Sequence, residues 1–375
     1  MSPQITASLI TLVGFLGLLL TIVPLMVWVE RRAGALMQDR PGPNRLGPFG
    51  LLQPLADVLK FIFKEDVLPL RADRPLYLMA PVLAVVPAFS TFVVIPLAPA
   101  LEIGGETVPM IVANVDTGVL LFLALASLGV YSLVIAGYAS NNKFSLLGSI
   151  RASAQMISYE LALTLAVVAV LLPVESFRLD RVVQYQIEGI WNVGPQILGF
   201  LVFLVAAFAE TNRLPFDLAE AESELIAGYH TEYSAMRFAS FFMAEYASMT
   251  VLSALAATLY FGGWHLPGVD LGALGVLGVV LGVGVLVAKI CAFMFLFVWV
   301  RWSFPRFRYD QLMAIGWKGL LPLAIVNLLW VAGAGLAGWL GWRSRSSRSS
   351  PPSPWARHWS WSSTATRSSR PSPWS

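Results

Sequence analysis

The chain has 375 residues, of which 57% are apolar and only 13% are charged. Soluble domains carry about 25% charged residues, so this composition excludes an ordinary soluble domain and indicates a polytopic membrane protein. The formal net charge of +3 becomes −3 without the six arginines of segment 343–375, so it gives no reason to expect nucleic-acid binding.

Long apolar stretches predict eight transmembrane helices, because a bilayer core needs about 20 apolar residues per helix. The first has no basic start and no small-residue cleavage site, so we expect it to be retained. We therefore predict an all-α membrane domain over residues 1–342. The expected spans cover about 5–29, 76–100, 117–139, 152–174, 191–210, 238–263, 271–300 and 319–342.

The loops expected on one side of the membrane contain far more lysine and arginine than the loops expected on the other side. Loops after the first, third, fifth and seventh expected spans hold sixteen basic residues, whereas the loops after the second, fourth and sixth hold two. Because short basic loops stay cytoplasmic, we expect the main loops in the cytoplasm of a bacterial cell and the protein in its inner membrane.

Segment 30–66 joins the first two spans and is rich in charge, Gly and Pro. Pro fixes φ and Gly supplies conformations that other residues avoid, so this loop is expected to hold a specific backbone shape. Within it, residues 53–64 place Leu55, Val58, Leu59, Ile62 and Phe63 on one helical face. We expect a short amphipathic helix along the membrane surface that either packs on neighbouring spans or roofs an opening for a lipid-soluble molecule.

Acidic residues near the cytoplasmic ends of three spans are the next signal. Glu160, Glu210 and Glu245 are expected at most about 12 Å below the surface, given 1.5 Å per helical residue. A buried charge costs roughly 2.5–3.5 kcal/mol on insertion scales, so such residues normally face a wet cavity, a partner charge or a proton path. Carboxyl groups that switch between charged and neutral forms suit proton transfer.

The loop after the fifth span adds an acidic run interrupted by the turn Arg213-Leu-Pro215. Like charges this close shift one another's titration, so protonation there is expected to respond to nearby charge. A solvated acidic face is the plainer alternative. The run consists of Glu210, Asp217, Glu220, Glu222, Glu224 and Glu232.

Cysteine and histidine are too few for a redox centre. Cys291 lies within an expected span, and His230, His265 and His358 are scattered, so we expect no metal site, disulfide or cysteine-bound iron–sulfur cluster in this chain. Segment 343–375 is a low-complexity Ser/Arg/Pro/Trp tail with near-repeats and no apolar period. We expect this tail to be disordered or not native, with binding as the alternative.

Four segments together resemble one family. They read ERRAGALMQDRPGPNRLGPFGLLQPLADVLKFIFKE, ASNNKFSLLGSIRASAQMISYE, AETNRLPFDLAEAESELIAGYHTEY and RWSFPRFRYD, in this order along the chain. They closely resemble the quinone-chamber membrane subunit, the H-type subunit, of proton-pumping NADH:quinone oxidoreductase, respiratory complex I. The resemblance covers residues 1 to about 342.

The resemblance implies a subunit that takes quinone as its substrate and has no covalently bound cofactor. FMN and iron–sulfur clusters would sit in partner subunits, and the partners would be peripheral iron–sulfur and quinone-pocket subunits, small and antiporter-like membrane subunits, and lipid. Glu160, Glu210, Asp217 and Glu245 would carry a proton or charge relay, joined by the acidic loop residues Glu220, Glu222 and Glu224. The chamber residues would be Arg31, Gln38, Arg40, Asn44, Arg45 and Arg213.

Two alternatives remain open. A membrane subunit of a related hydrogenase or formate-oxidising complex shares the architecture, although the full first two motifs favour the respiratory form. A free-standing proton or ion transporter could also use embedded glutamates, but it predicts internal repeats, and the two halves of the chain show none.

Overall fold

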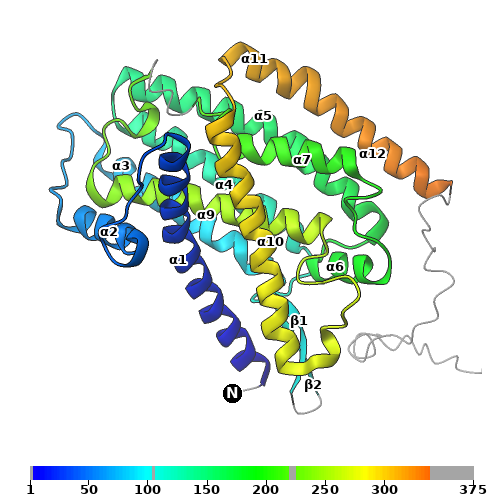
Figure 1. Cartoon of the computed structure of the whole chain (residues 1–375). Coiled ribbons are helices and arrows are strands. Elements are labelled where there is room, and N and C mark those ends of the chain that lie inside the picture. The colour runs from blue at the N-terminus through cyan, green and yellow to red at the C-terminus, as the bar shows by residue number, and fades with distance from the viewer. Residues whose placement is uncertain (1–2, 104–105, 219–224, 338–375) are drawn as a thin grey trace, which may run out of the picture.

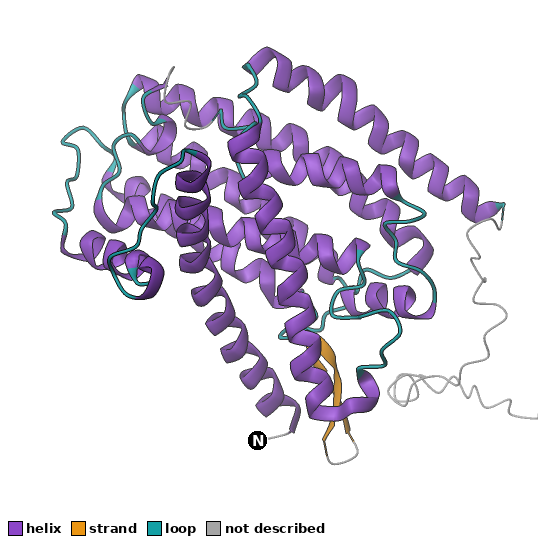
Figure 2. Ribbon diagram, viewed as in Figure 1, coloured by secondary structure: helices purple, strands orange, loops and turns teal. Residues whose placement is uncertain are grey.

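The computed structural model describes residues 3–103, 106–218 and 225–337, and in these ranges the chain is a bundle of helices with one small β-hairpin (Figures 1 and 2). The predicted all-α class is confirmed. Among the described residues, seven helical segments are long and apolar enough to cross a membrane. They are residues 11–37 of α1 (Pro3–Met37), α3 (Arg74–Ser90) with η2 (Thr91–Val94), α4 (Gly118–Ala139), α5 (Lys143–Val174), α9 (Ala235–Tyr260), α10 (Gly275–Ser303) with η4 (Gly272–Leu274), and α11 (Tyr309–Ala314) running through the π-helix η5 (Ile315–Leu320) into α12 (Leu321–Leu336).

The fifth expected span is shorter than predicted. It forms α7 (Ile197–Glu210), whose 14 residues extend about 21 Å at 1.5 Å per residue and fall short of a bilayer core of about 30 Å. The apolar run before it is broken by Gly189 and by the turn at Trp191–Gly194, where Gly194 N–H donates to the Trp191 carbonyl. The preceding amphipathic helix α6 (Leu179–Glu188) was not predicted.

Two further expectations on element bounds were wrong. The second span was expected to reach residue 100, but its helix ends at Val94 and the chain enters the hairpin β1 (Ala98–Ile103) and β2 (Glu106–Met110). The fourth span was expected to begin at 152, but α5 begins at Lys143, where the Asn142 side chain accepts a hydrogen bond from Phe144 N–H as an N-cap. Ser145 and Ser149, which follow Asn142, are fully buried in the helix instead of forming part of a loop.

The predicted surface helix is confirmed as α2 (Gln53–Phe63), which lies at the left edge of the molecule in Figure 1. Arg31 of α1 ties it to the bundle through an ion pair of 2.5 Å with Asp57. The five apolar side chains of its predicted face are 43–85% exposed, so the described residues leave much of that face uncovered. The helix also contacts α9, where the Phe61 ring lies 6.1 Å from that of Phe238.

The loop before α2 is anchored to α1 through η1 (Pro48–Gly50). The Phe49 carbonyl accepts hydrogen bonds from Trp28 Nε1 at 3.0 Å and from Arg32 Nη1 at 2.9 Å. The guanidinium carbon of Arg32 lies 5.6 Å from the Trp28 ring centroid and 5.5 Å from that of Phe49. A loop fixed in this way has the defined shape that its Gly and Pro content predicts.

Helix α9 is the centre of the packed core. Every side chain from Val251 to Tyr260 is buried, and α9 contacts α1, α2, α3, α6, α7 and α10. In Figure 1, α2 lies at one end of the bundle, while α6 and the β1–β2 hairpin lie towards the other. The predicted domain boundary at 342 and the predicted tail over 343–375 fall outside the described residues.

Candidate functional site

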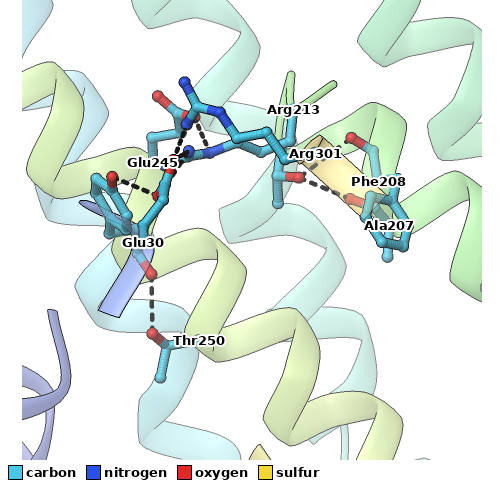
Figure 3. Close-up of polar contacts among 9 residues, drawn as sticks. Glu30, Ala207, Phe208, Arg213, Glu245, Thr250 and Arg301 are labelled. Atoms are coloured by element: carbon cyan, nitrogen blue, oxygen red, sulfur yellow. Dashed lines mark hydrogen bonds and ion pairs between the residues drawn. The ribbon is translucent and has the colours of Figure 1, made fainter. Parts of the chain in front are cut away.

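Four charged side chains meet where α1, α9 and α10 approach the turn after α7 (Figure 3). Arg213 Nη1 donates to the two carboxylate oxygens of Glu30 at 2.9 and 3.1 Å. Its Nε lies 2.5 Å from Oε1 of Glu245. Arg301, near the end of α10, pairs with the same Glu30 carboxylate. Two acids and two bases therefore balance their formal charges, and we call these four residues the charge cluster.

The charge cluster lies inside the protein. The side chains of Arg213 and Glu30 are 4% and 8% exposed. Tyr246 closes one side, since its hydroxyl donates to Glu30 Oε2 at 2.7 Å and its ring centroid is 4.4 Å from the Arg213 guanidinium carbon. Burial opposes the charged form of Arg213, but Glu245 and Glu30 outweigh it and hold the pKa of the guanidinium well above its ordinary value. Arg213 is therefore a permanent cation between two acids.

Gln155 of α5 holds the turn that presents Arg213. Its Nε2 donates to the carbonyl oxygens of Ala209 at 2.8 Å and Phe216 at 2.7 Å. The side chain is fully buried, so these bonds are shielded from water and fix the turn against α5. Gln155 belongs to the second of the four motifs, residues 139–160. Its hydrogen bonds therefore fix the start of the third motif, residues 209–233.

Glu210 ends α7 beside a cavity of about 550 Å³ of empty space, part of it open to the outside, which Glu245, Asn212 and Tyr229 also line. A second cavity, of about 450 Å³, shares Glu210 as a lining residue. The Glu210 side chain is buried, and its Oε2 has no hydrogen-bond partner among the described residues. An oxygen left without a protein donor beside open space suits a water molecule or a proton.

Glu160 lies deeper along its helix than the sequence indicated. Because α5 begins at Lys143, Glu160 is near the middle of this helix instead of close to its start. It is half-buried, and its carboxylate is close enough to Glu210 for their charges to interact. The sequence placed Glu160 about eight residues into its span, whereas the helix itself begins nine residues earlier, at Lys143.

Asp217 is buried and forms an ion pair of 2.9 Å with Arg306, from the segment after α10. This pair fastens the turn after α7 to the fourth family-like motif. Phe307 N–H donates to the Pro215 carbonyl at 3.2 Å and supports the same contact. The side chains of Arg213 and Asp217 therefore point in different directions from the same turn. Arg213 contacts α1 and α9, and Asp217 contacts the segment after α10.

The residues of the first loop that were predicted to line a chamber are not joined to the charge cluster in the described part of the chain. Arg31 is half-exposed and binds Asp57 of α2. Gln38, Arg40, Asn44 and Arg45 are exposed, and within the described ranges no hydrogen bond or ion pair connects them to Glu30, Arg213 or Glu245. Glu220, Glu222 and Glu224 of the expected acidic run lie outside the described residues.

Glu30, Tyr246 and Arg301 were not predicted as members of the site. Glu30 stands at the apolar-to-charged boundary of the first span, and Arg301 opens the fourth family-like motif. Both residues stand out in the sequence, but the contact between them could not be predicted, because Glu30 and Arg301 are 271 residues apart in the chain. Tyr246 directly follows Glu245 in the sequence, but a tyrosine next to a glutamate is too common to indicate a site residue.

The fold and the charge cluster define a class of protein: a polytopic helical membrane protein with paired acids and bases at its core. The family model for NADH dehydrogenase matches residues 10–332. The chain belongs to the NADH dehydrogenase family, and the resemblance carried by the four motifs is confirmed.

Curated relatives support the same assignment. The chain is 49% identical to an H subunit of NADH-quinone oxidoreductase from Koribacter versatilis over 343 residues, which covers 87% of this chain and 96% of that protein. It is 48% identical to an H subunit of NADH-quinone oxidoreductase from Cytophaga hutchinsonii, covering 83% and 91%. It is 45% identical to the H subunit of NADH-quinone oxidoreductase from Leptospira biflexa, covering 86% and 93%.

Proposed function

We propose that this chain is the H-type membrane subunit of a proton-translocating NADH:quinone oxidoreductase, in which it forms the quinone chamber and passes charge through buried carboxylates. Family membership and three relatives that carry this name support the proposal. The same relatives favour it over a hydrogenase or formate-oxidising complex. A free-standing transporter has no support from them.

The chamber would open between α1, α2 and α9. Support comes from the uncovered apolar face of α2, which a bilayer would cover, and from the rigid loop that Trp28 and Arg32 anchor. A quinone would enter beneath α2 with its apolar tail in lipid. Arg31, Gln38, Arg40, Asn44 and Arg45 would shape or seal the chamber against a peripheral subunit, and Arg213 would form its inner wall.

The uncovered face of α2 gives a direct test of this entry route. An aspartate at position 59 would place a charge where the proposal places lipid, and the insertion cost of such a charge is up to about 3 kcal/mol. Leu59→Asp is expected to lower the quantity of assembled complex or raise the KM for quinone about fivefold or more. Lys60→Asp is the control, because Lys60 lies on the polar side of the same helix. Equal behaviour of both variants would contradict entry beneath α2.

The relay would start at Glu210 and Asp217 and continue through Glu160 and Glu245. The observation that carries this proposal is the buried Glu210 carboxylate beside a cavity that Glu245 also lines, with Oε2 lacking a donor in the described part of the chain. The proximity of Glu160 to Glu210 supports the next step. The acidic residues Glu220, Glu222 and Glu224 would surround the entrance.

Electrostatics supply a sufficient driving force for this relay. Two unit charges 4 Å apart interact by about 4 kcal/mol at an effective dielectric of 20. One pKa unit corresponds to about 1.4 kcal/mol, so a charge that appears or disappears on the quinone shifts a nearby carboxyl by more than one unit. In the charge cluster, a proton on Glu245 would leave Arg213 with Glu30 as its only charged acid partner, which makes Arg213 the element that senses the change.

Partner subunits would carry the electron-transfer chemistry. FMN and iron–sulfur clusters would reside in peripheral subunits, and small and antiporter-like membrane subunits would receive the relayed charge. Seven apolar helices and relatives from bacteria fit a bacterial membrane protein. The uneven distribution of Lys and Arg supports cytoplasmic main loops in the inner membrane.

The test is Glu210→Gln, which keeps the shape of the side chain and removes its titration. Inhibitor-sensitive NADH:quinone reduction is measured in membranes, with the assembled complex quantified on native gels. We expect assembly close to wild type and turnover lower by about tenfold or more, because proton transfer by a positioned side chain contributes at least this much. Asp217→Asn is expected to act in the same direction, with part of its loss due to the broken pair with Arg306.

Glu175→Gln is the matched control, since Glu175 is exposed just beyond the end of α5, away from both cavities. It is expected to retain wild-type turnover. Wild-type turnover in Glu210→Gln would remove the relay from this residue and leave the chain a chamber and scaffold.

A further inference from the structure

The C-terminal end of α9 is buried and yet fully supplied with hydrogen-bond donors. The last carbonyls of a helix lack partners within the helix, and in a membrane interior water does not supply them. Gln186 of α6 donates to the Thr258 carbonyl at 2.8 Å, and Asn192 donates to that of Leu259 at 2.8 Å. The backbone N–H of Val193 donates to the Tyr260 carbonyl at 3.1 Å.

In the turn that follows α9, the backbone carbonyl groups of three more residues point towards the same position. Gly262 and Gly263 have φ of 72° and 55°, in the left-handed region that favours glycine. A Cβ atom on Gly262 would lie 2.8 Å from Nε1 of Trp191, so a side chain does not fit there. The turn thereby directs the carbonyls of Phe261, Gly263 and His265 at the same group.

That group is the ammonium of Lys289, which projects from α10. Its Nζ lies 2.7 Å from each of the three carbonyl oxygens and 4.7 Å from the ring centroid of Trp191. An ammonium has three donors, and all three are used. In the described ranges no ion pair joins Lys289 to a carboxylate, so the three carbonyl oxygens and the negative end of α9 are the groups that stabilise its charge.

The opposite half of the same helix carries Glu245 and Tyr246, two contacts of the charge cluster. Glu245 lies about 24 Å from Phe261 along α9, at 1.5 Å per residue. Apart from Ser248, which borders both cavities, the side chains from Tyr246 to Tyr260 are buried, so α9 is expected to shift as one packed element when one of its ends is released.

We propose that Lys289 is a positioning residue: by closing the C-terminal end of α9, it sets the place of Glu245 against Arg213. The inference rests on the proposed relay role of Glu245. Lys289 itself contacts neither Glu245 nor the two cavities.

The experiment uses the purified complex carrying Lys289→Ala, with and without propylammonium, which replaces the deleted atoms and their charge. Misplacement of a reacting group by about 1 Å costs up to a hundredfold in rate. We expect turnover per assembled complex to fall about tenfold, and propylammonium to restore at least about half of it. The neutral analogue 1-propanol fills the same space without donating three hydrogen bonds and is expected to restore nothing. Turnover within about twofold of wild type, or equal rescue by both additives, would overturn the proposal.

A second pair of variants covers failure of Lys289→Ala to assemble. Lys289→Arg keeps a cation with several donors, whereas Lys289→Met keeps only the length, so Arg is expected to support more assembled complex than Met. Equal quantities in both would overturn the role of the ammonium. Lys318→Met, at an exposed lysine of η5, is the control and is expected to match wild type.

Glu245→Gln, measured in parallel, separates this inference from the proposed function. Lost turnover in Glu245→Gln with normal turnover in Lys289→Ala would overturn only the positioning role. Normal turnover in Glu245→Gln would overturn the relay role of Glu245. In that case a lower temperature of thermal inactivation in Lys289→Ala, reversed by propylammonium alone, would still support closure of the α9 end, and an unchanged temperature would overturn it.

Discussion

Arg213→Met is expected to destabilise the protein by about 3–5 kcal/mol, because it removes the cation shared by the buried carboxylate of Glu30 and the mostly buried carboxylate of Glu245. Glu245 would lose its ion pair, and Glu30 would keep only Arg301 and the Tyr246 hydroxyl. The measurement is the quantity of assembled complex on native gels together with the temperature at which quinone reduction is lost.

A second substitution tests the electrostatic cause. Adding Glu245→Gln to Arg213→Met removes the uncompensated negative charge, so the double variant is expected to be more stable than Arg213→Met alone. Arg308→Met is the matched control, since the Arg308 side chain is 80% exposed in its pair with Asp310, and exposed pairs contribute about 0–1 kcal/mol. Equal loss in Arg308→Met and Arg213→Met, or no recovery in the double variant, would contradict the role assigned to the charge cluster.

The elements that the sequence predicted well are those with a local signal. Apolar length placed the long helices, and the spacing of Leu55, Leu59 and Ile62 placed α2 within one residue of its end. The exposed fractions of these side chains add what periodicity alone does not give, because an apolar helical face has the same spacing whether it is covered or open.

The errors occurred where tertiary contacts decide the structure. The polar start of α5 resembles a loop, yet Gly148 lets it pack closely on the backbone of η3 (Gly228–His230), since a Cβ there would lie 2.8 Å from Gly228 Cα. The first three residues of β1, 98–100, were predicted as the end of a span because a short apolar run fits a helix and a strand equally well.

The site shows the same division between local and distant signals. Individual acids inside spans stood out because each is rare in lipid. The pairing of Glu30 with Arg213 and Arg301 did not stand out, because these arginines lie 183 and 271 residues from Glu30 in the chain. The charge cluster forms only when the chain folds, because its members lie too far apart in the sequence for any local pattern to predict their contact.

Gly50→Ala is expected to abolish most quinone reduction while the complex still assembles. Gly50 has φ of 76°, and a Cβ there would lie 2.2 Å from the Pro43 carbonyl oxygen and 2.9 Å from Asn44 N. The left-handed conformation alone costs alanine about 1–2 kcal/mol, and the backbone contact requires the loop itself to move. The displaced segment includes Asn44 and adjoins Arg45, two of the proposed chamber residues.

Turnover per assembled complex is expected to fall about tenfold or more, since a shift of about 1 Å in a positioned group has effects of this size. Gly333→Ala is the control, because Gly333 lies in α12 with nothing within 4 Å of an added Cβ. Alanine there is expected to leave turnover unchanged and to favour the helix by up to about 1 kcal/mol. Wild-type turnover in Gly50→Ala would mean that quinone reduction does not depend on the shape of this loop, and the chamber would then have to be formed by α1, α2 and α9 alone.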